Sequence, residues 1–269
     1  APLIFLIFFL FNMTTISIRL GVISALHQEQ AGLIENMTSV STHKHAMRHY
    51  VEGKLGDLDC VFVLSRIGKV AAAATVTTLI ERFKVTHIVF TGVAGAADAS
   101  IGIGDVVVAD RLIQHDMDAS PLFPRFEIPL TGQSHFLSAL SLTESVVEAV
   151  TLFLKDDMKN HISVADRDVF FSGTPRVHRG LIASGDSFIH CQEKIAVLKQ
   201  SLPDLLAVEM EGAAVAQVCF EFGVPFAVIR TISDNANEHS PTDFMRFIDQ
   251  VASIYAFHII QRLCILLRQ

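Results

Sequence analysis

Several features that would assign this chain of 269 residues to other protein classes are missing from its sequence. Basic residues form no strong cluster and the net charge is −7, which argues against nucleic acid as the main partner. No long polar or low-complexity segment occurs, so disorder is not expected. The cysteines contain no Cys-x-x-Cys pair and have largely apolar neighbours, so we expect reduced core thiols and a cytoplasmic protein. They are Cys60, Cys191, Cys219 and Cys264.

An apolar run, Ala1–Phe11, opens the chain and is too short to span a bilayer as a helix. It also lacks the positive segment and the small-residue cleavage site of a secretory signal. We therefore expect residues 1–16 to be an apolar amino-terminal extension, of which the part before Met13 is non-native or wrongly assigned and Met13 is the natural start, and 17–269 to form the domain. A degenerate signal or membrane anchor is the alternative; we expect no membrane partner.

Three histidines gather at His43, His45 and His49, and the last two have the spacing that places both on one helix face. No glutamate stands between them, so the HExxH motif of metalloproteases is absent. Glu52 is the one carboxylate close by in the sequence. The sequence predicts a solvated polar stretch, no metal site and no cofactor.

Strand and helix signals alternate along the rest of the chain, and 51% of residues are hydrophobic. The expected strands are Ile18–Ser24, two strands between Met47 and Leu64 with a turn at Gly53–Asp59, Thr86–Thr91, Asp105–Ala109, Arg179–Gly185 and Pro225–Asp234. The expected helices are His27–Asn36, Lys69–Arg82, Ala139–Leu154, Gln192–Lys199 and Thr242–Leu267. This order predicts a single-domain, three-layer α/β/α protein with a largely buried central sheet.

Two carboxylates, Glu209 and Glu211, flank Met210 at the end of an apolar run. Side chains two apart on a strand share a face, and burying two carboxylates there is costly. A ligand with hydroxyl groups explains them most simply. The alternative is that one of them caps the following helix.

A second apolar run ends in Ser233 and Asp234. Ligands of open α/β sheets bind at the carboxyl ends of strands, and a cleft of low dielectric constant suits a carboxyl group for proton transfer. Asp234 is therefore a candidate general acid or base, with an Asx-turn leaving the strand as the alternative.

Five segments stand in a distinctive order and spacing: Gly21–Glu29, Ser65–Ala73, Thr91–Gly95, Ser184–Ile189, and Val208–Glu211 with Ser233–Asp234. Together they resemble the 5′-methylthioadenosine/S-adenosylhomocysteine nucleosidases of the purine nucleoside phosphorylase superfamily. The resemblance extends from Ile18 to the carboxyl terminus. It implies a nucleoside phosphorylase-like fold with a mixed sheet, and hydrolysis of the N-glycosidic bond of an adenine nucleoside that carries a 5′-thioether.

The resemblance also implies roles for individual residues. Glu29 matches the carboxylate that activates the attacking water, Asp234 the acid that protonates adenine at N7, and Ser233 the residue that orients this acid. Such a division suits the chemistry, because the sugar gains positive charge while the leaving base needs a proton.

Further matches concern substrate binding. Phe188 corresponds to the aromatic residue that stacks on the purine, and Ile189 to the residue whose backbone contacts the edge of the base. Met210 and Glu211 match the ribose-binding pair, and Glu209 an acidic position beside the sugar. The segment Val93, Ala94 and Gly95 is expected to line the same site.

Departures from the family pattern bear on the nucleophile. Phe90 and Val93 occupy the places at which the superfamily's phosphorylases use arginine and serine to hold phosphate. Neither side chain binds an oxyanion, which favours water as the nucleophile. A phosphorylase, a futalosine-type hydrolase and a non-catalytic nucleoside-binding domain remain the alternatives. A Rossmann dehydrogenase is disfavoured because G-x-G-x-x-G is missing after the first strand.

The Pro-rich segment 117–136 predicts a long functional loop. The family resemblance implies that such a loop helps to form the 5′-thioether pocket, partly across a homodimer interface, and Phe123 and Phe126 are its candidate residues. The segment 151–178 is longer than we expect for the family, and the sequence assigns it no role.

Overall fold

The computed structural model describes residues 17–30, 32–237 and 240–268, without the side chains of Gln28, Glu29 and 240–243. The predicted apolar extension, 1–16, lies outside the described residues. Within the described part of the chain, no helix is long and apolar enough to cross a membrane.

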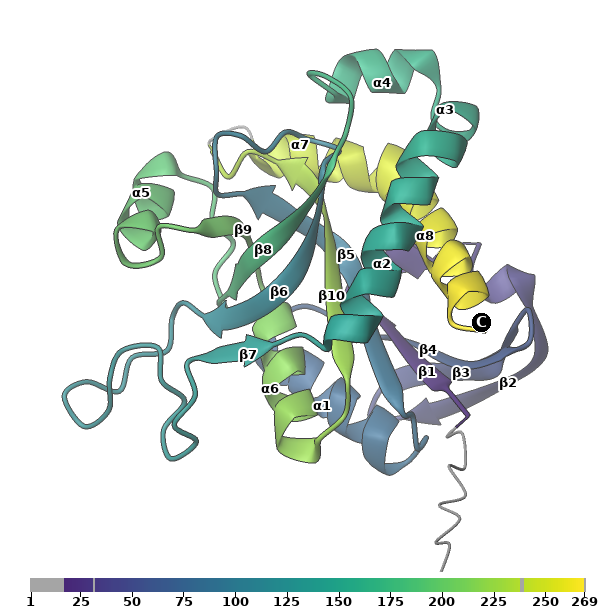
Figure 1. The fold of residues 1–269 in the computed structure, drawn as a ribbon, viewed down its shortest axis with the longest axis horizontal. Coiled ribbons are helices and arrows are strands. Elements are labelled where there is room, and N and C mark those ends of the chain that lie inside the picture. Colours follow the sequence, from purple (N-terminus) through teal and green to yellow (C-terminus); the bar gives the residue numbers. More distant parts are fainter. Residues whose placement is uncertain (1–16, 31, 238–239, 269) are drawn as a thin grey trace, which may run out of the picture.

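A mixed sheet of ten strands forms the centre of the molecule (Figure 1). Its strands are β1 Arg19–Ser24, β2 Met37–His45, β3 Arg48–Leu55, β4 Leu58–Leu64, β5 His87–Ala96, β6 Val106–Gln114, β7 His135–Leu137, β8 Val177–Ser184, β9 Leu205–Glu209 and β10 Phe226–Asp234. The central strands are buried on both sides, as the continuous apolar runs predict. The predicted α/β class with a mixed central sheet is confirmed.

Strand β5 pairs with β1, β9 and β10, so one half of the sheet closes on itself through β10, β6, β8 and β9. Strands β1, β4, β5 and β10 run parallel, which brings their carboxyl ends to one edge. A bulge between Ile232 and Asp234 sets Asp234 opposite Gly95 of β5. The topology thus places the polar ends of the predicted strands together.

Helices cover both faces of the sheet (Figure 1). One apolar core contains residues of α2 and α8, and a second core contains residues of α1 and α6. The helices are α1 Lys69–Glu81, α2 Leu140–Leu152, α3 Met158–His161, α4 Val164–Phe170, α5 Gln192–Ser201, α6 Gly212–Phe222, α7 Ser240–Phe247 and α8 Ser253–Leu266. Short π-helical turns follow α2 and α7, at Phe153–Asp157 and Ile248–Ala252, so the single carboxyl-terminal helix that we predicted is divided into α7 and α8.

One prediction near the amino terminus is wrong, and one strand there was missed. The segment His27–Asn36 forms two short 3₁₀ turns, η1 His27–Gln30 and η2 Ile34–Asn36, because Gly32 between them has a φ of 80° that no α-helix accommodates. Strand β2 was not predicted. It is an edge strand exposed on both faces, so its sequence lacks the apolar alternation of a half-buried strand.

Other element boundaries differ from the predicted ones. Strand β5 continues through Ala96 instead of closing at Thr91, and β6 continues to Gln114 instead of ending at Ala109. The segment 151–178 holds the π-helical turn at Phe153–Asp157, α3 and α4.

Candidate active site

A cavity of about 340 Å³ lies at the carboxyl ends of the parallel strands. Ten of the predicted site residues line it, from four separate parts of the chain. They are Val93, Ala94, Gly95, Phe188, Ile189, Glu209, Met210, Glu211, Ser233 and Asp234. The cavity therefore unites residues that the sequence spreads over more than half of its length.

Asp234, the predicted acid, is 1% exposed. The Ser233 hydroxyl donates to Asp234 Oδ2 at 2.8 Å, and the Ala236 backbone N–H donates to Asp234 Oδ1 at 2.9 Å. The contact with Ala236, two residues on, is that of an Asx-turn, so this alternative coexists with the placement in the cavity. A Cβ atom on Gly95 would lie 3.0 Å from Asp234 Oδ1, so glycine gives the carboxylate its room.

Glu209 is held on every side. Its carboxylate accepts backbone N–H groups of Gly212 at 2.8 Å and Glu211 at 3.1 Å, and it also accepts the Ser184 hydroxyl. These contacts cap the start of α6, as the alternative interpretation of this residue expects. Arg230 Nη2 completes the set at 2.7 Å.

Arg230 was not among the predicted site residues, although it lines the cavity and is 1% exposed. Its guanidinium group pairs with Glu209 and lies 4.0 Å from the centre of the Phe90 ring. The sequence carried a signal for it: Arg230 is the one charged residue inside the apolar run before Ser233. A buried cation in such a run needs a buried anion, and Glu209 provides it.

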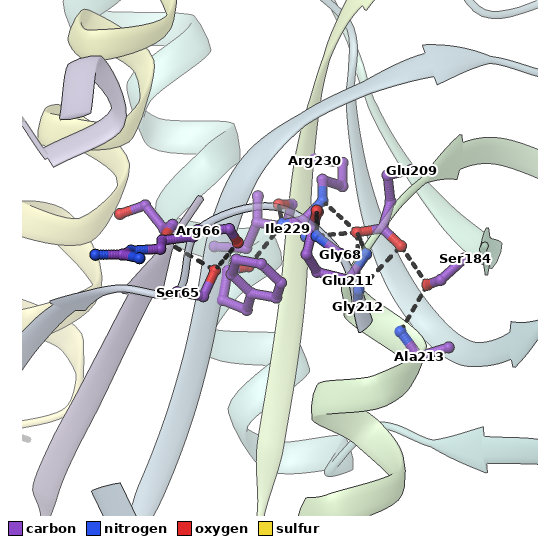
Figure 2. Close-up of polar contacts among 12 residues, drawn as sticks. Ser65, Arg66, Gly68, Ser184, Glu209, Glu211, Gly212, Ala213, Ile229 and Arg230 are labelled. Carbon is purple, nitrogen blue, oxygen red and sulfur yellow. Dashed lines mark hydrogen bonds and ion pairs between the residues drawn. The ribbon is translucent and has the colours of Figure 1, made fainter. Parts of the chain in front are cut away.

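Glu211 is buried at the cavity wall, where its Oε1 accepts the Gly68 backbone N–H at 2.8 Å. Gly68 precedes α1 with a φ of 98°, a conformation that favours glycine. Figure 2 shows Glu211 and Glu209 close together, with Gly68 next to Glu211. The contact ties the strand end that carries Glu211 to the start of α1.

A polar cluster at Lys69, next to Gly68, also fixes the start of α1. Asp186 accepts the Lys69 backbone N–H at 2.8 Å, while Lys69 Nζ donates to Asp116 at 2.6 Å. Burial alone would raise the pKa of Asp116, but the bonds from Lys69 and from the Asp186 backbone lower it below its ordinary value. Asp116 thus stays ionised and anchors the beginning of α1.

Aromatic and apolar side chains line another part of the cavity. Phe188 is 39% exposed and meets Phe244 edge to face at 5.7 Å between ring centres. Ile189 is buried beside it, and Met245 completes this part of the wall. Because Phe188 lines the cavity and is partly exposed, its ring is suited to stacking on a planar ligand.

Phe123 and Phe126 do not line the cavity, and the placement of Glu29 relative to it stays a prediction. Glu29 lies in η1, and its side chain is outside the described residues. The loop that holds Phe123 and Phe126 projects away from the sheet (Figure 1), and both side chains are half-buried. Phe126 packs against the small core that includes Ile189.

The histidine cluster lies on the β2–β3 hairpin, where His43 contacts Glu52 at 2.8 Å. In the described part of the chain, no group of three or more histidine, cysteine, aspartate or glutamate residues is arranged to hold a metal ion. All four cysteines are free thiols, and three of them are buried.

A mixed sheet that closes on itself, with this cavity at its strand ends, defines a nucleoside phosphorylase-like α/β protein. The sequence profile of a family described as the phosphorylase superfamily matches residues 19–263. A 5′-methylthioadenosine/S-adenosylhomocysteine nucleosidase of Shewanella denitrificans is 38% identical over 232 residues, which cover 86% of this chain and 92% of the relative.

Solved structures agree. The nucleosidase of that name from Neisseria meningitidis, in complex with methylthio-immucillin-A, has a TM-score of 0.80 at 30% identity and covers 91% of this chain and 97% of its own. The one from Colwellia psychrerythraea, in complex with adenine, has a TM-score of 0.80 at 32% identity over 92% and 95%. The chain belongs to the phosphorylase superfamily and, within it, to the 5′-methylthioadenosine/S-adenosylhomocysteine nucleosidase family.

Proposed function

We propose that this chain hydrolyses the N-glycosidic bond of S-adenosylhomocysteine, 5′-methylthioadenosine or both, releasing adenine and the thioribose product. The observation that carries the proposal is the buried Ser233–Asp234 pair in a cavity that is also lined by Glu211 and the partly exposed ring of Phe188. An acid for the base, a carboxylate for the sugar and a stacking ring are the parts that the reaction needs.

The steps follow from these positions. The purine stacks on Phe188 and presents N7 to Asp234, which donates its proton as the bond to the sugar breaks. Glu211 accepts the ribose hydroxyls. Water attacks the positively charged sugar carbon and passes a proton to Glu29, a role that stays a prediction from the family resemblance. Glu209 acts through Arg230 and the start of α6, because its oxygens are already engaged.

Water is favoured over phosphate by the surroundings of Arg230. This arginine is the cation that lines the cavity among the described residues, and Glu209 neutralises it at 2.7 Å. The ring of Phe90 covers its guanidinium group, and Val93 offers only methyl groups. A phosphate would therefore meet no uncompensated positive charge here.

Adenine release tests the proposal directly. Purified protein should release adenine from both nucleosides at a rate that does not change when phosphate is added. A requirement for phosphate would identify a phosphorylase instead. Turnover of futalosine without turnover of either thioether nucleoside would identify the other hydrolase, and no turnover of any of them would leave a nucleoside-binding domain.

The contribution of Glu211 can be separated by substrate design. Glu211→Gln retains an oxygen for the Gly68 N–H but loses the charge that strengthens bonds from ribose hydroxyls, each worth roughly 1.5–3 kcal/mol. We expect kcat/KM for ribosides to fall on the order of 10-fold or more, while 2′,3′-dideoxy analogues change little. Glu148→Gln, at an exposed position of α2, is the matched control. Equal losses on both substrate types would rule out direct contact with the hydroxyls.

Location and assembly complete the proposal. The free thiols support a reducing compartment such as the cytoplasm, because oxidising compartments favour disulfides. A homodimer, in which Phe123 and Phe126 reach the 5′-thioether of a neighbouring subunit, stays a prediction from the family resemblance.

A further inference from the structure

A second cavity, of about 820 Å³, adjoins the first, and Ala25, Leu26 and Ile67 line both. It lies between η1 and the β2–β3 hairpin. Its described lining is rich in basic side chains and contains no carboxylate: His27, Arg48, His49 and Arg66 take part. The mechanism proposed above uses none of these residues.

Arg48 and Arg66 have no anionic partner among the described residues. The ion pairs formed by arginines in the described part of the chain include neither of them. Their described hydrogen bonds go to backbone carbonyls instead: Arg48 to Ala46, Ser65 and Ala71, and Arg66 to Met47. Arg48 Nε is buried and has no hydrogen-bond partner among the described atoms. A buried donor on a cation favours an anion as its partner.

The backbone at Arg66 is also unusual. Its φ is 68°, in the left-handed region that costs free energy for a residue with a side chain. Figure 2 shows the Arg66 side chain extending away from Glu209 and Glu211, while the adjacent Ile67 lines both cavities. The strained turn therefore directs a guanidinium group to the side on which the second cavity lies.

The order of the residues gives the direction of a bound nucleoside. The base belongs at Asp234 and Phe188, and the ribose at Glu211, which bonds to Gly68. Ile67 and Arg66 precede Gly68 directly in the chain. A substituent on the 5′ carbon that passes Ile67 and Leu26 therefore enters the cavity lined by Arg48 and Arg66.

We propose that the second cavity binds the amino-acid end of the 5′-thioether, with Arg66 and Arg48 holding its carboxylate. Gln30, which is buried at the same cavity and donates to the Val63 carbonyl at 2.8 Å, supplies a side-chain oxygen for the ammonium group. This inference rests on the proposed function and makes S-adenosylhomocysteine the preferred substrate, because a methylthio group carries no charge for this cavity.

The test compares S-adenosylhomocysteine with the aminopropyl thioether that results from removing its carboxyl group. We expect the native protein to prefer the carboxylate by on the order of tenfold in kcat/KM, since the contact is charge-assisted. Arg66→Gln should reduce this preference to about twofold or less and leave turnover of 5′-methylthioadenosine nearly unchanged. Arg48→Gln, a second variant at a less exposed position, should act in the same direction.

Arg179→Gln, at an exposed position of β8, is the matched control and should keep the full preference. If the two arginines only fasten the hairpin through the Ala46 and Met47 carbonyls, both variants lower the melting temperature and leave the substrate ratio unchanged, which overturns the inference. That result leaves the proposed function intact. Absence of adenine release from every thioether nucleoside by the native protein instead overturns the proposed function itself.

Discussion

Asp234→Asn should lower turnover of the thioether nucleosides by on the order of 10²-fold or more, because the variant keeps the shape of the acid but has no proton to donate. The asparagine oxygen can still accept the Ala236 N–H, and the Ser233 hydroxyl can rotate to accept from the new amide group. Folding should therefore survive. The measurement is single-turnover adenine release at saturating substrate, which reports the chemical step.

Two controls accompany this variant. Asp168→Asn removes an exposed carboxylate from α4, outside the cavity, and should leave the rate unchanged. Binding of a transition-state-like inhibitor to the Asp234 variant should persist in part, since stacking on Phe188 and the Glu211 contacts remain. Near-native turnover by Asp234→Asn would show that another group protonates the base.

The central strands and their polar ends could be predicted because each step was local. The run before Asp234 is apolar over its whole length, as a strand buried on both faces requires, and its first polar residues mark its carboxyl end. The same logic located Glu209 at the end of β9. Parallel strands place such ends at one edge, so Asp234 was expected there, whereas Phe188, Ile189 and Val93–Gly95 came from the family resemblance.

Contacts that depend on non-local register could not be predicted. Arg230 and Glu209 are 21 positions apart, and they meet because β5 pairs with both β9 and β10. The bulge beside Ser233 places Asp234 opposite Gly95, and no local sequence signal predicts this bulge. The sequence also left the capping role of Glu209 open as an alternative to ligand binding, which was the simpler explanation.

Exposed elements could not be predicted for a different reason. Strand β2 pairs only along one edge and buries little of either face, so its polar sequence matches a loop as well as a strand. The second cavity depends on this strand, which was not predicted, and on η1, which was predicted as part of an α-helix. The sequence therefore could not predict that Arg48 and Arg66 lie at one cavity.

The largest expected effect on stability comes from Arg230→Met, which removes one partner of a buried ion pair. Glu209 would keep its bonds from Gly212 and Ser184 but lose its compensating charge, while its side chain is only 2% exposed. Breaking such a pair costs about 3–5 kcal/mol, because an uncompensated buried charge remains. We expect the free energy of unfolding, measured in urea at neutral pH, to fall by this amount.

The double variant Arg230→Met with Glu209→Gln should recover part of this loss, since it removes the stranded charge while the glutamine oxygen still accepts the Gly212 N–H. Arg179→Met, an exposed arginine in β8 without a described ion pair, is the matched control and should change stability by about 0.5 kcal/mol or less. Recovery in the double variant separates charge from packing, because the methionine is the same in both. A loss below about 1 kcal/mol for Arg230→Met, or no recovery when Glu209 is neutralised, would mean that the pair is not the closed electrostatic unit that its burial and its 2.7 Å separation indicate.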